Sequence, residues 1–392
     1  YEKALLNQGF FIAFQISIKR GNSENRFTIF AISMATTKKD IRALTKEELR
    51  AFFEKQGDKA FRGNQVYEWL WEKSCTDFEE MSNLSKPLRE KLKETFTINN
   101  VQVHQSQFSS DKTIKSTFML FDNNIIEGVL IPATDRMTAC VSSQVGCSLT
   151  CKFCATGYMD RKRNLNADEI YDQVVLIDKQ AKENYQIPLS NIVYMGMGEP
   201  LLNYSNVLRS IELLTAEEGM GISPKRITVS TAGIAKMIRK LGEDKVKFNL
   251  ALSLHAANDI KRSSIMDIND SNNLDSLSEA LVYFHEATGT RVTFEYIIFK
   301  DFNDSIEDAR ELAVFAKAVP CKINIIEYNP IDDGDFQQAD TEKVSAFAAY
   351  LESKNIIVNI RRSRGKDIDA ACGQLANKNS AIAKEERELK KI

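Results

Sequence analysis

Residues 147–154 read Cys147-Ser-Leu-Thr-Cys151-Lys-Phe-Cys154, which places three cysteines within eight positions. The stretch directly follows a candidate strand at 137–143. Thiolates at spacings of four and three can converge on one [4Fe–4S] cluster, because a loop can wrap its sulfurs around the corners of a cube. Three ligands for four irons leave one iron open, which indicates that a substrate binds there. The alternatives are a zinc site or three unrelated thiols, but residues 155–254 contain no Cys or His that could complete a zinc site.

The composition is that of a soluble globular protein. Of its 392 residues, 43% are hydrophobic and 27% are charged, which argues against bulk disorder. No apolar run reaches the roughly 18 residues that a membrane-spanning helix needs, so we expect no membrane contact. The cysteine count of seven is odd, which favours metal ligation in a reducing cytoplasm over a secreted disulfide framework. The net charge of −2 gives no general attraction for nucleic acid.

The first 33 residues differ from the rest of the chain. An apolar segment at 10–18 is too short to cross a membrane, and a basic residue follows it rather than a small-residue cleavage site. Met34 then opens a sequence typical of a natural start. We therefore interpret residues 1–33 as a non-native or disordered extension, with an additional genuine strand as the alternative.

Residues 40–105 predict a small helical accessory domain. The first helix begins with a Thr45-x-x-Glu48 capping box and ends at a glycine. The expected helices of this domain are 45–56, 64–73 and 83–95. Residues 106–135 predict a linking β-hairpin, because two stretches of alternating character, 113–121 and 125–131, flank a turn-like Asp-Asn-Asn.

Strands alternate with helices over residues 136–376. The expected strands are 137–143, 191–195, 226–230, 247–254, 292–298, 323–328 and 356–361. The expected helices are 166–184, 204–218, 233–241, 274–288, 304–318 and 340–353. This alternation predicts an α/β fold with a parallel sheet and right-handed crossovers. Six βα units are too few for a closed eight-fold barrel, so we expect a partial (βα)6 barrel with its site at the C-terminal ends of the strands. Residues 377–392 form a charged tail.

The cysteine spacing at the end of the first barrel strand resembles the radical S-adenosylmethionine (SAM) superfamily. Four motifs narrow the resemblance to the RlmN/Cfr family and within it to the RlmN type: QVGCSLTCKFCATG at 144–157, YMGMGEP at 194–200, LSLHA at 252–256 and ACGQL at 371–375. The resemblance covers residues 40 to 376. It implies a [4Fe–4S] cluster on Cys147, Cys151 and Cys154 and an enzyme that uses SAM to methylate C2 of adenine in 23S rRNA and in tRNA.

The resemblance also implies SAM contacts at polar strand ends. They are Gly198, Glu199, Ser230, Ser253, Leu254, His255 and Asn329. Gly198 and Glu199 match the position that binds the methionine amino group, and the others match ribose, carboxylate or adenine contacts. Without the resemblance, Gly198 and Glu199 would be a simple turn and His255 a packed core histidine.

Three further residues match catalytic roles of the family. The resemblance implies that Cys372 carries the methyl group as S-methylcysteine and that Cys140 releases the product by forming a transient disulfide with Cys372. It also implies that Glu127 accepts the proton from C2. From the residues alone, Cys140 would be a buried structural thiol and Glu127 the polar face of an amphipathic strand.

Cations gather near the predicted catalytic face, where an RNA backbone would have to pass. They lie at 361–366, which holds four, and at Arg161, Lys162 and Arg163. In the helical domain, RNA could be contacted by Arg62, Trp69, Trp71 and Lys73, although both tryptophans are as easily explained as core. We also expect a monomer that receives its electron from a flavodoxin-type donor.

Two other functions remain open. A Cfr-type enzyme would methylate C8 of the adenine instead of C2, and motifs separate the two imperfectly. A non-catalytic iron–sulfur or zinc RNA-binding protein would tolerate replacement of Cys140 and Cys372.

Overall fold

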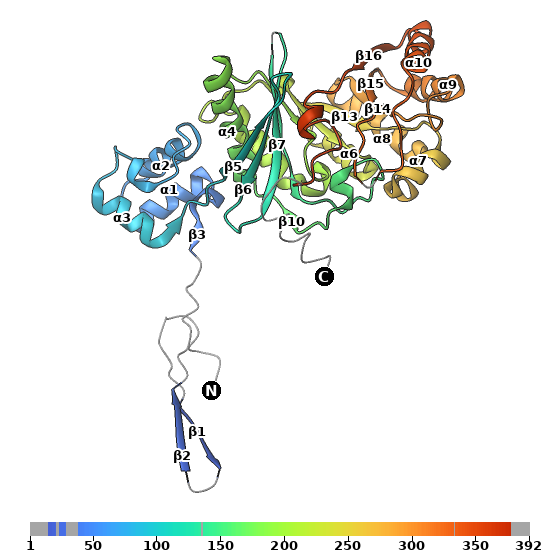
Figure 1. Ribbon diagram of the computed structural model, residues 1–392. Helices are drawn as coiled ribbons and strands as arrows, with labels where there is room; N and C mark the ends of the chain where they lie inside the picture. The colour runs from blue at the N-terminus through green and yellow to red at the C-terminus, as the bar shows by residue number, and fades with distance from the viewer. Residues whose placement is uncertain (1–14, 21–22, 29–37, 135, 333, 378–392) are drawn as a thin grey trace.

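A computed structural model describes residues 15–20, 23–28, 38–134, 136–332 and 334–377 of the chain (Figure 1). Strands β1 (Gln15–Arg20) and β2 (Ser23–Thr28) form an antiparallel hairpin that pairs only with itself among the described strands. Most of the proposed extension 1–33, and the tail from 378 onward, lie outside the described residues. The interpretation of residues 1–33 therefore stays a prediction.

The helical unit contains three α-helices, as the sequence predicts. They are α1 (Lys46–Lys55), α2 (Phe61–Trp71) and α3 (Lys86–Thr95). Thr45 and Glu48 form the expected capping box at the start of α1. Two short parallel strands, β3 (Lys39–Asp40) and β4 (Phe96–Thr97), bring the two ends of the unit together.

An antiparallel sheet leads from this unit into the barrel. The strands β5 (Gln102–Phe108), β6 (Ile114–Met119) and β7 (Ile125–Pro132) pair in sequence order, and β7 pairs with β8 (Met137–Cys140). The hairpin of β6 and β7 was predicted, but β5 was not. The reason is that β5 is an edge strand with mostly exposed polar residues, so it lacks the apolar alternation that marks a strand.

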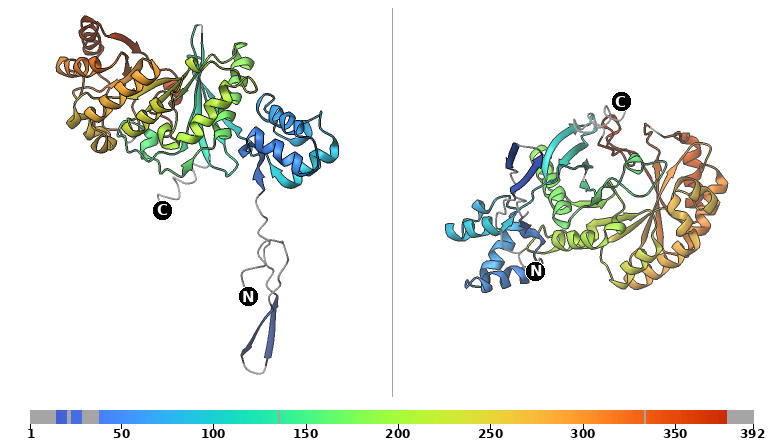
Figure 2. Two further views of the ribbon diagram at one scale, coloured as in Figure 1. Left: turned by 180° about the vertical axis from the view of Figure 1, so that it is seen from behind. Right: turned by 90° about the horizontal axis from the view of Figure 1, so that it is seen from below.

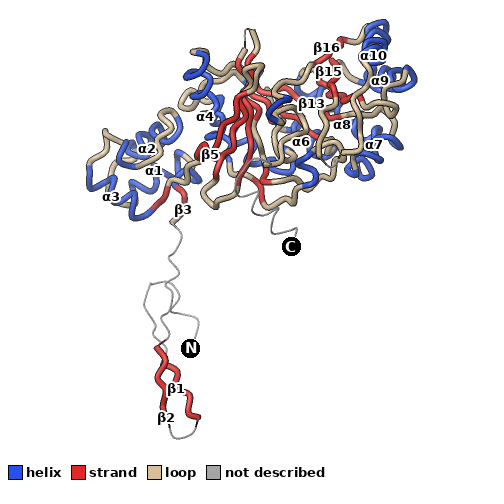
Figure 3. The backbone as a smooth tube through the Cα atoms, in the orientation of Figure 1, coloured by secondary structure: helices blue, strands red, loops and turns tan. Residues whose placement is uncertain are grey.

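Seven parallel strands make up the rest of the sheet. They follow the order β8, β11 (Asn191–Tyr194), β12 (Ile227–Thr231), β13 (Asn249–Ser253), β14 (Val292–Ile298), β15 (Cys321–Glu327) and β16 (Ile357–Arg361). Because the ten-stranded sheet ends at β5 on one side and at β16 on the other, the barrel is open. Figure 2 shows it from below as an arc, and Figure 3 distinguishes the strands from the helices by colour. The predicted partial α/β barrel is confirmed.

Helices cover the outer face of the arc. They are α4 (Ala167–Tyr185), α5 (Tyr204–Thr215), α6 (Ala235–Glu243), α7 (Asp259–Ile265), α8 (Leu274–Thr288), α9 (Ile306–Phe315) and α10 (Thr341–Ser353). All but the short α7 were predicted. The cluster loop is framed by two paired short strands, β9 (Gln144–Val145) and β10 (Arg163–Asn164). The 3-10 turns are Ile41–Ala43, Phe78–Glu80, Ala155–Tyr158, Pro200–Asn203, Pro224–Arg226, Asp267–Ser271, Ala316–Ala318 and Lys366–Ile368.

A buried arginine joins the helical unit to the barrel. The Arg42 guanidinium donates to both carboxylate oxygens of Asp172 at 2.8 and 2.9 Å and to Asp168 at 3.0 Å, and both aspartates lie on α4. Asp40 stands 3.8 Å away on the other side. The same guanidinium also donates to the carbonyl of Asn99. Four partners therefore converge on one cation at the junction.

The open side of the barrel is crossed by residues 364–377, which we call the closing segment. It leaves β16 at the far edge of the sheet and returns to β6 and β7. At its start, the Gly365 amide donates to Asp111 at 2.9 Å, and Asp367 accepts from the Ser109 hydroxyl at 2.5 Å. At its end, the Asn377 side chain donates to the carbonyl of Ile125 at 2.8 Å. Cys372 lies within this closing segment.

Candidate active site

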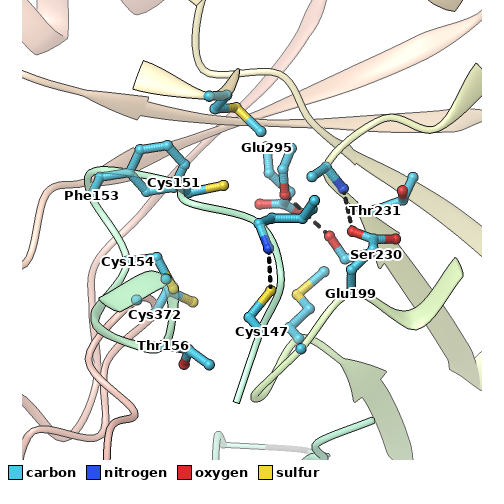
Figure 4. A pocket seen from close by; sticks show the side chains of 18 of the residues that line it. Cys147, Cys151, Phe153, Cys154, Thr156, Glu199, Ser230, Thr231, Glu295 and Cys372 are labelled. Atoms are coloured by element: carbon cyan, nitrogen blue, oxygen red, sulfur yellow. Dashed lines mark hydrogen bonds between the residues drawn. The ribbon is translucent and has the colours of Figure 1, made fainter. Parts of the chain in front are cut away.

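The main cavity lies where the parallel strands end, as an α/β sheet predicts. It holds about 880 Å³ of empty space. Its wall is built from the cluster loop 147–157, the C-terminal ends of β11 to β14, and the loop around Cys372. Figure 4 shows these side chains facing one another across the cavity.

The three cysteines of the motif line this cavity together. Burial and the neighbouring thiol of Cys154 raise the pKa of Cys147 to about 11, and burial with the same kind of neighbour raises that of Cys151 further. A bound cation reverses this effect, since it stabilises thiolates. A donor set of three sulfurs, gathered on one loop at one cavity, suits an iron–sulfur cluster. In the described part of the chain, no three His, Cys, Asp or Glu side chains are grouped tightly enough for a single metal ion.

Gly198 and Glu199 form one wall of the cavity. Gly198 has a φ of +93°, and a Cβ there would lie 2.4 Å from Cβ of Gln144, so only glycine fits. The Glu199 carboxylate is buried and accepts from the backbone amides of Ala232 at 2.8 Å and Leu201 at 3.0 Å. Burial raises its pKa. Both residues line the cavity, and their role toward SAM stays a prediction.

Ser230, Ser253 and His255 also line the cavity. The two serine hydroxyls stand 3.3 Å apart at the ends of β12 and β13. Burial lowers the pKa of His255 to about 3, so the ring is neutral. Because its Nδ1 accepts from the Ile297 amide at 3.1 Å, the proton of the ring lies on Nε2. His255 is thus both a packed histidine and a cavity residue with one donor available.

Leu254 and Asn329 are not among the described residues that line the cavity. The Leu254 side chain is fully buried. The Asn329 side chain donates to the carbonyl of Cys372 at 3.3 Å, and its Oδ1 has no hydrogen-bond partner within the described residues. Asn329 therefore supports the Cys372 loop in this structure.

A second cavity of about 720 Å³ adjoins the first. Cys154, Cys372 and Gly373 line both cavities, while Cys140 and Arg361 line only the second. The structure therefore brings Cys140, the last residue of the first barrel strand, to the cavity that Cys372 also faces. All seven cysteines lie in the described residues and are free thiols, so the predicted disulfide between Cys140 and Cys372 is not formed in this structure.

The environment of these two thiols differs from that of a surface cysteine. Burial raises the pKa of Cys140 to about 12, and the neighbouring Cys372 acts in the same direction. Cys372 is exposed, but what it faces are the two cavities, where desolvation raises the pKa of its thiol. Arg361 opposes this increase at both cysteines.

Glu127 lies away from both cavities. It is 1% exposed and is not among the described residues that line either one. Its Oε2 accepts from the backbone amides of Ala376 at 2.9 Å and Asn377 at 3.2 Å. The Glu127 carboxylate therefore does not face either of the cavities that could receive an adenine. Its assigned role as proton acceptor stays a prediction.

Glu295 is a site residue that the sequence analysis missed. It lies in β14, lines the main cavity and is 4% exposed. Its carboxylate accepts from Asn324 at 2.8 Å and stands 3.5 Å from the Arg361 guanidinium. A single acidic residue inside the otherwise apolar strand Val-Thr-Phe-Glu-Tyr-Ile-Ile was the available signal, because an unpaired buried charge is costly.

The proposed RNA contacts are only partly free to bind RNA. Arg163 is paired with Asp122 at 2.6 Å and with Glu169 at 2.7 Å, so it serves the fold. Trp71 is 1% exposed and belongs to the core of the helical unit. By contrast, Arg362 and Arg364 line the second cavity beside Cys372. The basic segment after β16 therefore remains the stronger candidate for contact with a phosphate backbone.

The site has three groups of residues: the three motif cysteines, the polar residues at the strand ends, and the pair Cys140 and Cys372. The chain that carries it can be compared with known proteins. Residues 141–313 match the radical SAM superfamily, and residues 39–98 match the ribosomal RNA large subunit methyltransferase N-terminal domain. A crystal structure of a radical SAM methyltransferase from Sphaerobacter thermophilus has a TM-score of 0.81 and 38% identity, over 86% of this chain and 99% of that one. Fold and site thus define a radical SAM enzyme, whose cofactors are a [4Fe–4S] cluster and SAM.

Two curated relatives narrow this class. A protein of Cytophaga hutchinsonii is 63% identical over 89% of this chain and 97% of its own length, and one of Flavobacterium psychrophilum is 56% identical over 88% and 99%. Both carry the name probable dual-specificity RNA methyltransferase RlmN. The chain belongs to the RlmN family of radical SAM RNA methyltransferases.

Among the described residues, none of the helices combines the length and the apolar character that crossing a bilayer requires.

Proposed function

We propose that this enzyme methylates C2 of adenine in 23S rRNA and in tRNA, through a methyl group carried on Cys372. The observation that carries this proposal is the position of Cys372, which lines the cavity of the three motif cysteines and also the adjoining cavity of Cys140. A thiol at this position can receive a methyl group on one side and exchange with a second thiol on the other.

Cys147, Cys151 and Cys154 are the residues that would hold the cluster. Bound there, the cluster supplies the electron that cleaves SAM to methionine and a 5′-deoxyadenosyl radical. We assign the binding of SAM to the cavity wall around Gly198, Glu199, Ser230, Ser253 and His255, with Leu254 and Asn329 as supporting residues. The neutral His255 ring offers its Nε2 proton to an oxygen of the cofactor.

The methyl transfer needs a carrier because adenine C2 is not a nucleophile. Cys372 would first lose its thiol proton and attack the methyl carbon of one SAM molecule, which forms S-methylcysteine and releases S-adenosylhomocysteine. With a second SAM cleaved at the cluster, this methyl group would lose a hydrogen atom and its carbon would bond to C2, which links Cys372 to the RNA. The adduct would then return one electron to the cluster and give the C2 proton to a base. Cys140 then attacks the Cys372 sulfur and its thiol proton goes to the released carbon, which frees the methylated base and leaves a disulfide that an external reductant must reduce.

The C2 proton has to be accepted by a base, and the family assigns this step to Glu127. Because its carboxylate is engaged by residues 376 and 377, those residues must leave it before it can act. We place the reaction in the cytoplasm, with a monomeric enzyme and a flavodoxin-type electron donor as its partners.

The test is mass spectrometry of nucleosides from 23S rRNA and tRNA after anaerobic turnover with isotopically labelled SAM. We expect labelled 2-methyladenosine from both RNAs. Recovery of 8-methyladenosine would instead assign the C8 reaction, and the absence of any methylated nucleoside with a fully loaded cluster would rule out both.

A further inference from the structure

The end of the closing segment is bound to a buried carboxylate. The backbone amides of Ala376 and Asn377 both donate to Oε2 of Glu127, at 2.9 and 3.2 Å. The second oxygen, Oε1, stands 3.6 Å from the ammonium of Lys115, whose side chain is 3% exposed. Lys115 also donates to the carbonyl of Asp369 in the same segment at 3.4 Å. Two successive amides and one ammonium thus converge on one carboxylate, which is the geometry of an anion-binding turn.

This anchor lies only four residues beyond Cys372. Between Cys372 and the anchor, the Gly373 carbonyl accepts from the Ala155 amide at 2.7 Å, and the Leu375 carbonyl accepts from the Thr156 hydroxyl at 2.6 Å. Both of those donors belong to the cluster loop. Cys372 is therefore held between the start of the closing segment, tied to the β5–β6 turn, and its end, tied to Glu127.

We propose that Glu127 is a positioning residue that holds Cys372 at the cavity by anchoring the amides of Ala376 and Asn377. It acts before RNA binds, in the transfer of the methyl group from SAM to Cys372. Charge-assisted hydrogen bonds from two amides, in a site closed to water, are strong enough to fix a short loop. The role assigned to Cys372 rests on the proposed function, whereas the anchoring itself does not.

Hydrogen exchange tests the anchor without any catalysis. In the protein with its cluster bound, the amides of residues 373–377 should exchange slowly. Glu127→Ala removes both acceptor oxygens and should raise exchange in this peptide roughly tenfold or more. Glu127→Gln retains one carbonyl oxygen for the two amides and should stay close to the parent. Glu169→Gln, which changes another buried carboxylate that makes no contact with the closing segment, is the matched control and should leave the peptide unchanged.

Methylation of Cys372 in the absence of RNA is the second readout. Each variant is incubated with SAM, and the peptide that contains Cys372 is followed by mass spectrometry. If Glu127 anchors the closing segment, Glu127→Ala should slow methylation of Cys372 roughly tenfold or more. Glu127→Gln should methylate Cys372 at close to the wild-type rate. If Glu127 only accepts the C2 proton, both variants should methylate Cys372 at the wild-type rate but should fail to methylate RNA.

The outcomes separate cleanly. Wild-type exchange and wild-type methylation in Glu127→Ala would overturn the anchor. If the wild type itself does not methylate Cys372, the proposed function fails, whereas faster exchange in Glu127→Ala still establishes the anchor. If Glu127→Ala does not fold, Ala376→Pro removes one of the two amide donors and leaves Glu127 in place. Its peptide should exchange faster, and unchanged exchange there would also overturn the anchor.

Discussion

Replacing Arg42 by methionine tests how the helical unit is held to the barrel. The Arg42 side chain is 3% exposed, and those of Asp40, Asp168 and Asp172 are 13%, 11% and 15% exposed. Methionine fills much of the same space but leaves three carboxylates buried around no cation. Removal of one partner from a buried ion pair costs about 3 to 5 kcal/mol. We expect a loss of stability of this size at pH 8, where the carboxylates are most fully charged.

Tryptophan fluorescence during urea unfolding measures this loss selectively, because both tryptophans of the chain, Trp69 and Trp71, lie in the helical unit. With a urea dependence of about 2 kcal/mol per molar, the unfolding midpoint should fall by about 1.5 to 2.5 M. The absorbance of the bound cluster reports on the barrel in the same sample and should change less.

Arg209→Met is the matched control. Arg209 also joins the barrel to the helical unit, through the Tyr67 hydroxyl at 3.3 Å, but its side chain is 31% exposed and its carboxylate partner Glu212 is 67% exposed. An exposed pair contributes less than about 1 kcal/mol, so its midpoint should move little. A shift below about 0.5 M for Arg42→Met, or an equal shift for both variants, would refute the reasoning from burial.

Three further predictions address the site and the junction. Cys140→Ala should allow methylation of Cys372 but trap the protein on its RNA, which appears as a slower band on a denaturing gel; free product without this band would contradict the release role. Glu199→Gln should weaken SAM binding roughly tenfold while the cluster absorbance is retained, and equilibrium dialysis that shows unchanged affinity would exclude a contact with the cofactor. Burial raises the pKa of Asp168 to about 7, above its unfolded value of about 3.9, so stability should fall as pH rises from about 4 to 7. Asp168→Asn should flatten this pH dependence in thermal unfolding, and an unchanged slope would contradict the assignment.

The local pattern of apolar residues predicted the helices and strands well where one face of the element is buried and the other is exposed. The barrel strands and six of their helices carry a clear apolar period, and Thr45 with Glu48 marks the start of α1. The edge strand β5 was missed because its exposed residues carry no such period. The short α7 escaped because its seven residues span barely two turns.

The site was harder to predict because it depends on long-range contacts. Cys147, Cys151 and Cys154 are close in sequence, so their spacing alone suggested that they bind one metal cluster. The pairing of Glu295 with Arg361 joins residues 66 positions apart. No local pattern can show that such side chains meet, so Glu295 was missed and Arg361 was predicted only as an RNA contact.

The open barrel explains how Cys140 on a strand and Cys372 on the closing segment can face the same cavity. Cys140 lies on β8, which pairs with β7 on one side and β11 on the other, while the far edge of the sheet stops at β16 and leaves an opening. The closing segment fills that opening with a backbone that is tied at Asp111 and at Glu127, and Cys372 lies between these ties. The Gly373 and Leu375 carbonyls also bind the cluster loop, so the segment holds Cys372 at the boundary of the two cavities. Cys372 can therefore face the cluster loop and Cys140 without any rearrangement of the sheet.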